Sequence, residues 1–147
     1  MKTKLLKLLA VMTISITALL ALGITASAET VGAFEVTGGT NGTDYTYENG
    51  VLTINTSTAL TIKNTNPSTS TTDRIEVATG VSANITLAGV NIDVSSQSNK
   101  AAFKIADNSA GNVTITLADG TTNTLKSGGN CAGLQKNGEY SETLGKL

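Results

Sequence analysis

The sequence predicts an all-β protein built as a parallel β-helix, and three observations carry that prediction. The stretch 74–87 is repeated at 103–117, with Val77 matching Ile105 (105 − 77 = 28). Apolar and polar residues alternate in short runs, which is the pattern of strands that bury one face. No part of the chain after Ala28 shows helical periodicity. A repeat of this length is typical of solenoids, in which each strand pairs with its counterpart in the next repeat.

The segment 1–28 is predicted to be a secretory signal peptide. Three early lysines precede the apolar run Leu8–Ile24, and the small-residue cleavage motif Ala26-Ser27-Ala28 follows. The alternative is an uncleaved membrane anchor, because the apolar run approaches spanning length. We expect cleavage after Ala28 and therefore a secreted or cell-surface protein that has no membrane contact afterwards.

The exported chain is then predicted to begin with a lead-in and continue as one domain. Residues 29–43 are rich in Gly and Thr and predict an irregular segment with one short strand at Phe34–Thr37. The β-helix domain is expected over residues 44–147. Near its start, Asn49-Gly50 separates two alternating runs, which predicts a hairpin because both residues of such a turn adopt positive φ.

The following strands are expected to stack in repeats of roughly 22 to 28 residues, a length within the range of solenoid repeats. Like residues should then lie above one another, and Asn84 over Asn112 is predicted to form one outward ladder. A β-sandwich is the alternative fold, because short strands with frequent turns also fit it. The three predicted inward rows are Ile54, Val77 and Ile105 with Leu134 next; Ile62, Leu87 and Ile115; and Ile92 and Val94 with Leu125.

The end of the sequence looks like a strand begun and not completed. Leu144–Leu147 resembles the start of another repeat, and no cap is visible that would cover the last apolar row. This predicts that the chain is the N-terminal portion of a longer surface protein. The alternative is that the tail Glu139–Leu147 folds over the open end.

Charge and composition exclude several partner classes. Cleavage would leave 147 − 28 = 119 residues, and removing three signal lysines leaves 7 basic against 11 acidic residues, a net charge of about −4. Nucleic acid and anionic lipid require clustered Lys and Arg, and the sequence has no basic run. The single cysteine, Cys131, excludes an internal disulfide. It is expected to be a packed free thiol, with a reactive thiol or intermolecular bridge as the alternative.

Three segments resemble a known family. Asp44–Ile54, Ile75–Leu87 and Gly129–Gly138 are similar to secreted, clostridial-type Gram-positive domains described as carbohydrate-binding right-handed parallel β-helices. These domains look like pectate lyases without the catalytic machinery. The resemblance implies a right-handed β-helix at the cell surface, with polysaccharide or cell-wall glycan as ligand and calcium as an optional ion. It carries no binding residue over to this sequence.

The residues available for chemistry predict a protein that is not an enzyme. The sequence has no His, and Arg74 is its single arginine. A polysaccharide lyase requires a base near the sugar and carboxylates that hold calcium, whereas Arg74 is expected to pair with a surface carboxylate. Glycoside hydrolysis requires two carboxylates close together, and nothing in the sequence joins Asp93, Asp107 and Asp119.

No cofactor is predicted, and calcium lacks a motif. Asp73, Asp107-Asn108 and Asp119-Gly120 offer oxygen ligands at turns, but the Gly-Gly-x-Gly-x-Asp repeat of calcium-binding β-rolls is absent from the sequence. Asp and Asn at turns are explained by turn geometry.

The candidate ligand-binding residues are Tyr45 and Tyr47, which lie two positions apart and so on one side of a strand. Aromatic faces stack on sugar rings, although the two tyrosines would also suit packing of the first apolar layer. We therefore predict an exported, non-catalytic module that binds polysaccharide. The alternative is a structural stalk or adhesin segment with no glycan ligand.

Overall fold

A computed structural model describes residues 27–106 and 112–136. Most of the expected signal peptide and the tail beyond residue 136 lie outside these ranges. The described residues contain no helix and form twelve short strands. The strands are β1 (Ala28–Val31), β2 (Phe34–Thr37), β3 (Tyr45–Glu48), β4 (Val51–Ile54), β5 (Ala59–Asn64), β6 (Arg74–Val77), β7 (Ala83–Leu87), β8 (Asn91–Asp93), β9 (Phe103–Ile105), β10 (Val113–Leu117), β11 (Thr124–Lys126) and β12 (Leu134–Lys136).

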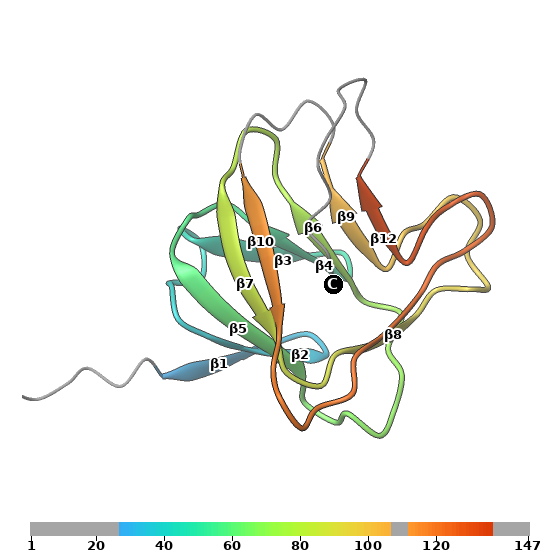
Figure 1. Cartoon of the computed structure of the whole chain (residues 1–147), viewed down its shortest axis with the longest axis horizontal. Coiled ribbons are helices and arrows are strands. Elements are labelled where there is room, and N and C mark those ends of the chain that lie inside the picture. Colours follow the sequence, from blue (N-terminus) through green and yellow to red (C-terminus); the bar gives the residue numbers. More distant parts are fainter. Residues whose placement is uncertain (1–26, 107–111, 137–147) are drawn as a thin grey trace, which may run out of the picture.

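The strands form three sheets around one interior (Figure 1). Two sheets have five strands each, in the orders β1-β2-β5-β7-β10 and β12-β9-β6-β4-β3, and the third pairs β11 with β8. From β6 onward, successive strands belong to the three sheets in a repeating order: β6, β9 and β12 lie in one sheet, β7 and β10 in the second, and β8 and β11 in the third. Six of the nine strand pairings described are parallel, and the antiparallel ones lie towards the N-terminus. The all-β prediction is confirmed. The three sheets and the mainly parallel pairing differ from the two antiparallel sheets that characterise the β-sandwich alternative.

Much of the predicted inward stacking is confirmed by the strand register. In each confirmed pair the two residues belong to adjacent parallel strands, as the repeat predicted. The confirmed pairs are Ile54 with Val77, Val77 with Ile105, Ile62 with Leu87, and Ile92 with Leu125.

The predicted register of β10 and β12 is wrong by two positions. Leu87 lies opposite Leu117 instead of Ile115, and Asn84 lies opposite Thr114 instead of Asn112. The reason is that the repeat length is not constant. Paired residues are 28 positions apart between β6 and β9 but 30 apart between β7 and β10, because the connection from β9 to β10 is longer than that from β6 to β7. In the same way, Leu134 lies opposite Phe103 rather than Ile105.

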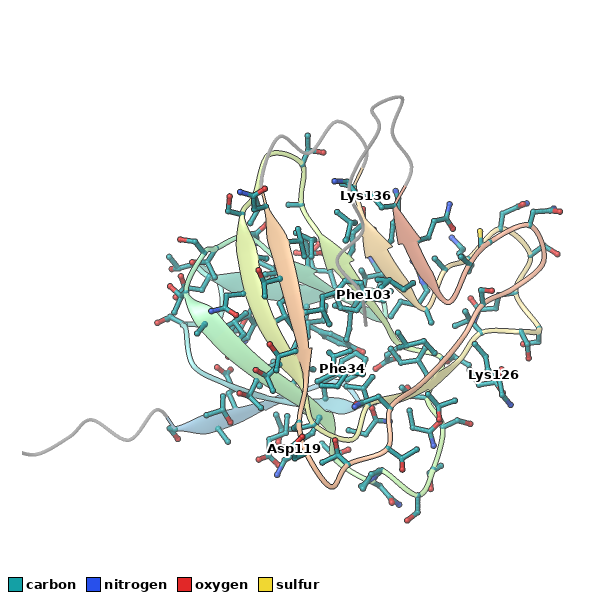
Figure 2. The ribbon with its side chains drawn as sticks, viewed as in Figure 1. Phe34, Phe103, Asp119, Lys126 and Lys136 are labelled. Atoms are coloured by element: carbon teal, nitrogen blue, oxygen red, sulfur yellow. The ribbon has the colours of Figure 1, made fainter. Side chains whose placement is uncertain are left out.

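The core is the shared interior of the three sheets. Figure 2 shows Phe34 and Phe103 there, and both are fully buried. Full burial of an aliphatic or Phe side chain contributes about 1.5–3 kcal/mol relative to exposure, so the stacked rows dominate the stability of the fold. The other large side chains of this core are Tyr45, Leu52, Ile54, Leu60, Ile62, Ile75, Ile85, Leu87 and Ile92.

The N-terminal region is more regular than the sequence suggested. The hairpin at Asn49-Gly50 is confirmed, with φ of 51° and 75° between the antiparallel strands β3 and β4. The predicted strand Phe34–Thr37 is β2, but a second strand, β1, pairs with it antiparallel and β2 then joins β5. The lead-in therefore supplies two adjacent strands at one end of a five-stranded sheet, with β1 at the edge and β2 between β1 and β5, in place of an irregular segment with one strand.

Candidate functional site

A groove of about 470 Å³ lies on the outer face of the sheet that contains β6, β9 and β12. Its floor is formed by side chains that point outward from these strands, such as Glu76 of β6 and Lys104 of β9. Ile75 and Val77 point into the core, so their neighbours on β6 point outward. Glu76 lies opposite Lys104 of β9 in the register. The residues lining the groove are Arg74, Glu76, Asn99, Lys100, Ala101, Lys104, Asn130, Cys131 and Gln135.

Two connections that run side by side form the wall of the groove (Figure 1). One joins β8 to β9 and the other joins β11 to β12. The amide of Asn99 donates to the carbonyl of Gly129 at 2.9 Å, and the amide of Gly128 donates to the carbonyl of Lys100 at 2.8 Å. Backbone bonds thus hold the second connection on the first in the same way that neighbouring strands are held.

Two asparagines occupy matching places in these connections. Asn99 and Asn130 both have positive φ, 59° and 68°. Asn tolerates this conformation better than most residues because its short amide bonds locally. The Asn130 Nδ2 donates to Asn99 Oδ1 at 3.3 Å, and both side chains are exposed. They place a ladder of amide groups beside the charged floor.

The groove concentrates positive charge in a chain whose formal net charge is −1. Arg74, Lys100 and Lys104 are three of the six basic residues in the described ranges. Glu76 is the one acidic residue of the lining, and its Oε1 lies 3.5 Å from Lys104 Nζ. Clustered cations at a partly enclosed surface raise the local concentration of anions. The site is therefore suited to an anionic ligand.

The predicted platform residues lie elsewhere, on β3. Tyr45 is 1% exposed, so its ring has no open face on which a sugar could stack, and it packs in the core. Its hydroxyl donates to Glu29 Oε2 at 3.0 Å. Burial, followed by this hydrogen bond, raises the pKa of Tyr45 to about 12. The packing alternative describes Tyr45 correctly.

Tyr47 is half-buried and packs against the core. Its ring covers Gly32, where a side-chain carbon would overlap it. The hydroxyl donates to Asp73 Oδ2 at 2.7 Å, and this bond is the main reason that the pKa of Tyr47 is raised to about 12. The structure does not bring either tyrosine into the groove.

Of the carboxylates considered for calcium, Asp73 and Asp119 lie in the described residues, and Asp119 is exposed in the turn after β10. Asp73 accepts hydrogen bonds from Tyr47 and from the amide of Ala33. Asp93, which was considered for glycoside hydrolysis and not for calcium, accepts from Ser95 and Lys126, and these bonds, that of the Ser95 hydroxyl above all, lower the pKa of Asp93 to about 2. Residues 27–106 and 112–136 contain no group of three His, Cys, Asp or Glu that could hold a metal ion. Asp107 and Asn108 lie outside the described residues.

The groove itself was not predicted from the sequence. Arg74 was expected to pair with a surface carboxylate, and Cys131 to be packed; the structure places both in the lining, with Cys131 half-buried. The available signal was the recurrence of Asn99 at Asn130 (130 − 99 = 31), a spacing that Phe103 and Leu134 share. Recognising it required knowing that the repeat length varies.

Comparisons with known proteins do not identify a family for this chain. No family model, curated protein or solved structure matches the chain. The described residues also include no helix with the length and apolar character that a membrane span needs. The function must therefore be argued from the groove.

Proposed function

We propose that this chain is an exported, non-catalytic module that binds an acidic polysaccharide in the groove on β6, β9 and β12. The observation that carries the proposal is the gathering of Arg74, Lys100 and Lys104 in one groove of an otherwise acidic chain. Arg and Lys bind carboxylates through charge-assisted hydrogen bonds, which are roughly twice as strong as neutral ones. The carboxylates of a uronate-bearing glycan are such partners.

The other lining groups suit a sugar. Asn99, Asn130 and Gln135 carry amides, which both donate to and accept from hydroxyl groups. A few placed polar groups beside charged ones are what a carbohydrate site needs to orient a ring. The lining contains no aromatic residue, so charge and hydrogen bonding replace ring stacking in this proposal.

The same lining supports a role without catalysis. Hydrolysis of a glycosidic bond uses two carboxylates that flank it. Glu76 is the one carboxylate among the lining residues, and Lys104 is paired with it. The groove therefore offers charge for binding but lacks the acid–base pair of a glycosidase.

The fold proposed for this module is a right-handed parallel β-helix. Rotation of the chain through three sheets and parallel pairing of strands 23 to 33 positions apart support this reading. The right hand is the one that parallel crossover connections take almost without exception. In this architecture the groove would run along the outer face of consecutive turns.

Binding to immobilised polygalacturonate tests the proposed function. The exported chain should be retained and should elute with salt, while neutral hydroxyethyl cellulose should retain less. Arg74→Gln and Lys104→Gln should each weaken binding about three- to tenfold. Lys63→Gln is the matched control, because Lys63 pairs with Glu35 on the other five-stranded sheet. No retention, or equal weakening by all three substitutions, would reject the groove as the site.

A structural stalk remains the second candidate, and one observation favours it. Leu117 and Leu134, on the last strands of two sheets, are 52% and 40% exposed. Such apolar strand edges are where further repeats would stack in a longer β-helix. A chain that binds none of a panel of acidic and neutral glycans would be assigned this role.

A further inference from the structure

Resting on the proposed function, we infer that Glu76 determines the ligand preference of the groove by competing with the ligand for Lys104. Glu76 and Lys104 lie opposite one another on adjacent strands, with the side chains on the outer face. Both line the groove, so an anionic ligand that reaches Lys104 also meets Glu76. The carboxylate of the protein occupies the place that a ligand carboxylate would take.

The pair is the loosest of the three ion pairs among the described residues. Lys104 Nζ lies 3.5 Å from Glu76 Oε1, whereas the Lys63–Glu35 and Lys126–Asp93 distances are 2.9 Å and 3.0 Å. A tight charge-assisted bond between nitrogen and carboxylate measures about 2.7–2.9 Å. Lys104 is thus held near Glu76 without being saturated by it. A ligand carboxylate can therefore also reach Lys104, but it does so beside the negative charge of Glu76.

The consequence is discrimination by charge density. A glycan with a carboxylate on every sugar brings several negative charges close to Glu76, and like charges at short range disfavour binding. A glycan with spaced carboxylates can engage Arg74 and Lys100 and place a neutral ring beside Glu76. A repulsive group inside a site is a common source of specificity, because it weakens the wrong ligand more than the right one. Glu76 thereby favours sparsely charged polymers.

Glu76→Gln tests this inference, with Glu35→Gln as the matched control. Both substitutions remove one negative charge from an ion pair on an outer sheet face, but Glu35 lies on the other five-stranded sheet. Affinity of the exported chain should be measured for polygalacturonate and for highly methyl-esterified pectin over a range of salt concentrations. Thermal unfolding of each variant checks the fold.

Glu76→Gln should tighten polygalacturonate binding about three- to tenfold, with a steeper salt dependence because one more cation meets the polymer. Binding of the esterified pectin should change less than twofold, and Glu35→Gln should change either by less than twofold. Equal tightening by Glu35→Gln would overturn the inference in favour of net charge. Retained binding with no effect of Glu76→Gln would overturn the inference alone. Absence of binding by both the native chain and Glu76→Gln would overturn the proposed function as well.

Discussion

At the scale of the residue, Asp73 joins three parts of the N-terminal region. Its Oδ2 accepts from the amide of Ala33 at 2.9 Å and from the Tyr47 hydroxyl at 2.7 Å. Asp73 itself immediately precedes β6. One carboxylate thus ties the β1–β2 turn and the β3 strand to the start of the groove floor.

Tyr47→Phe removes one of these bonds and leaves the ring in place. A hydrogen bond to a charged group contributes about 1.5–3 kcal/mol, and partial exposure places Tyr47 at the lower end. We expect the free energy of unfolding in urea to fall by about 1.5 kcal/mol and binding to polygalacturonate to be unchanged. Lost binding at unchanged stability would instead assign the Tyr47 hydroxyl a role in ligand binding.

The raised pKa values of Tyr45 and Tyr47 predict a loss of stability at high pH. Their pKa values are raised from 10.0 to about 12 in the folded chain, so the native state holds these protons more tightly than the unfolded state does. Stability is therefore complete below pH 10 and falls as the pH rises from 10 to 12. The free energy of unfolding, measured from about pH 8 to 12, should show this decline, and Tyr47→Phe should reduce it. An identical decline in the variant would contradict the assignment to Tyr47.

The sequence placed both tyrosines on one side of a strand but could not say which side. Period two fixes that Tyr45 and Tyr47 share a face. That this face is the interior follows from the hairpin register, in which Tyr45 lies opposite the buried Ile54. A ring with a hydroxyl suits either environment, so residue type alone did not decide between platform and core.

At the scale of the element, close contact between the two stacked connections depends on Gly128. A side-chain carbon at this position would overlap the carbonyl oxygen of Gln97, which belongs to the connection from β8 to β9. Gly128 is buried and its amide bonds to Lys100. No side chain can be accommodated unless the two connections separate.

Gly128→Ala should therefore destabilise the chain and disturb the groove wall. We expect a loss of about 1–3 kcal/mol, as for other overpacked sites, and weaker binding to polygalacturonate because Asn130 and Cys131 move with the connection. Gly129→Ala is the control, since a carbon there would meet nothing within 4 Å. Thermal unfolding and retention on the polymer measure both effects. Equal behaviour of the two variants would show that the connections are not closely packed.

Elements with strong local signals were predictable from the sequence, and their register was only partly so. Alternation located the strands, and Asn49-Gly50 located a hairpin because few residues adopt positive φ in succession. The register error that placed Ile115 instead of Leu117 opposite Leu87 has its origin in the connection from β9 to β10. That connection is longer than the one from β6 to β7, and its sequence has no alternating apolar residues that would reveal the extra length. The groove wall escaped prediction for the same reason, because connections without alternation carry little periodic information.

At the scale of the whole molecule, the inward rows become exposed at the last strands. Leu87 of β7 is 1% exposed, while Leu117, its partner on β10, is 52% exposed. Phe103 is fully buried, and Leu134 opposite it is 40% exposed. Each row is covered by the next strand, so its last described member has a covering neighbour on one side only.

Truncation to alanine should lower the free energy of unfolding far more at Leu87 than at Leu117, its partner on the next strand. Leu87→Ala should lower the free energy of unfolding by about 2–5 kcal/mol, since it leaves a cavity between strands on both sides. Leu117→Ala should cost less than about 1 kcal/mol, because water already reaches half of that side chain. Urea unfolding of both variants measures the difference. Similar costs would mean that Leu117 is covered in solution, and its row would then continue beyond β10 into another strand. A difference of the expected size would instead place the edge of this apolar row at β10, because only the inner strands β5 and β7 would then bury their leucines fully.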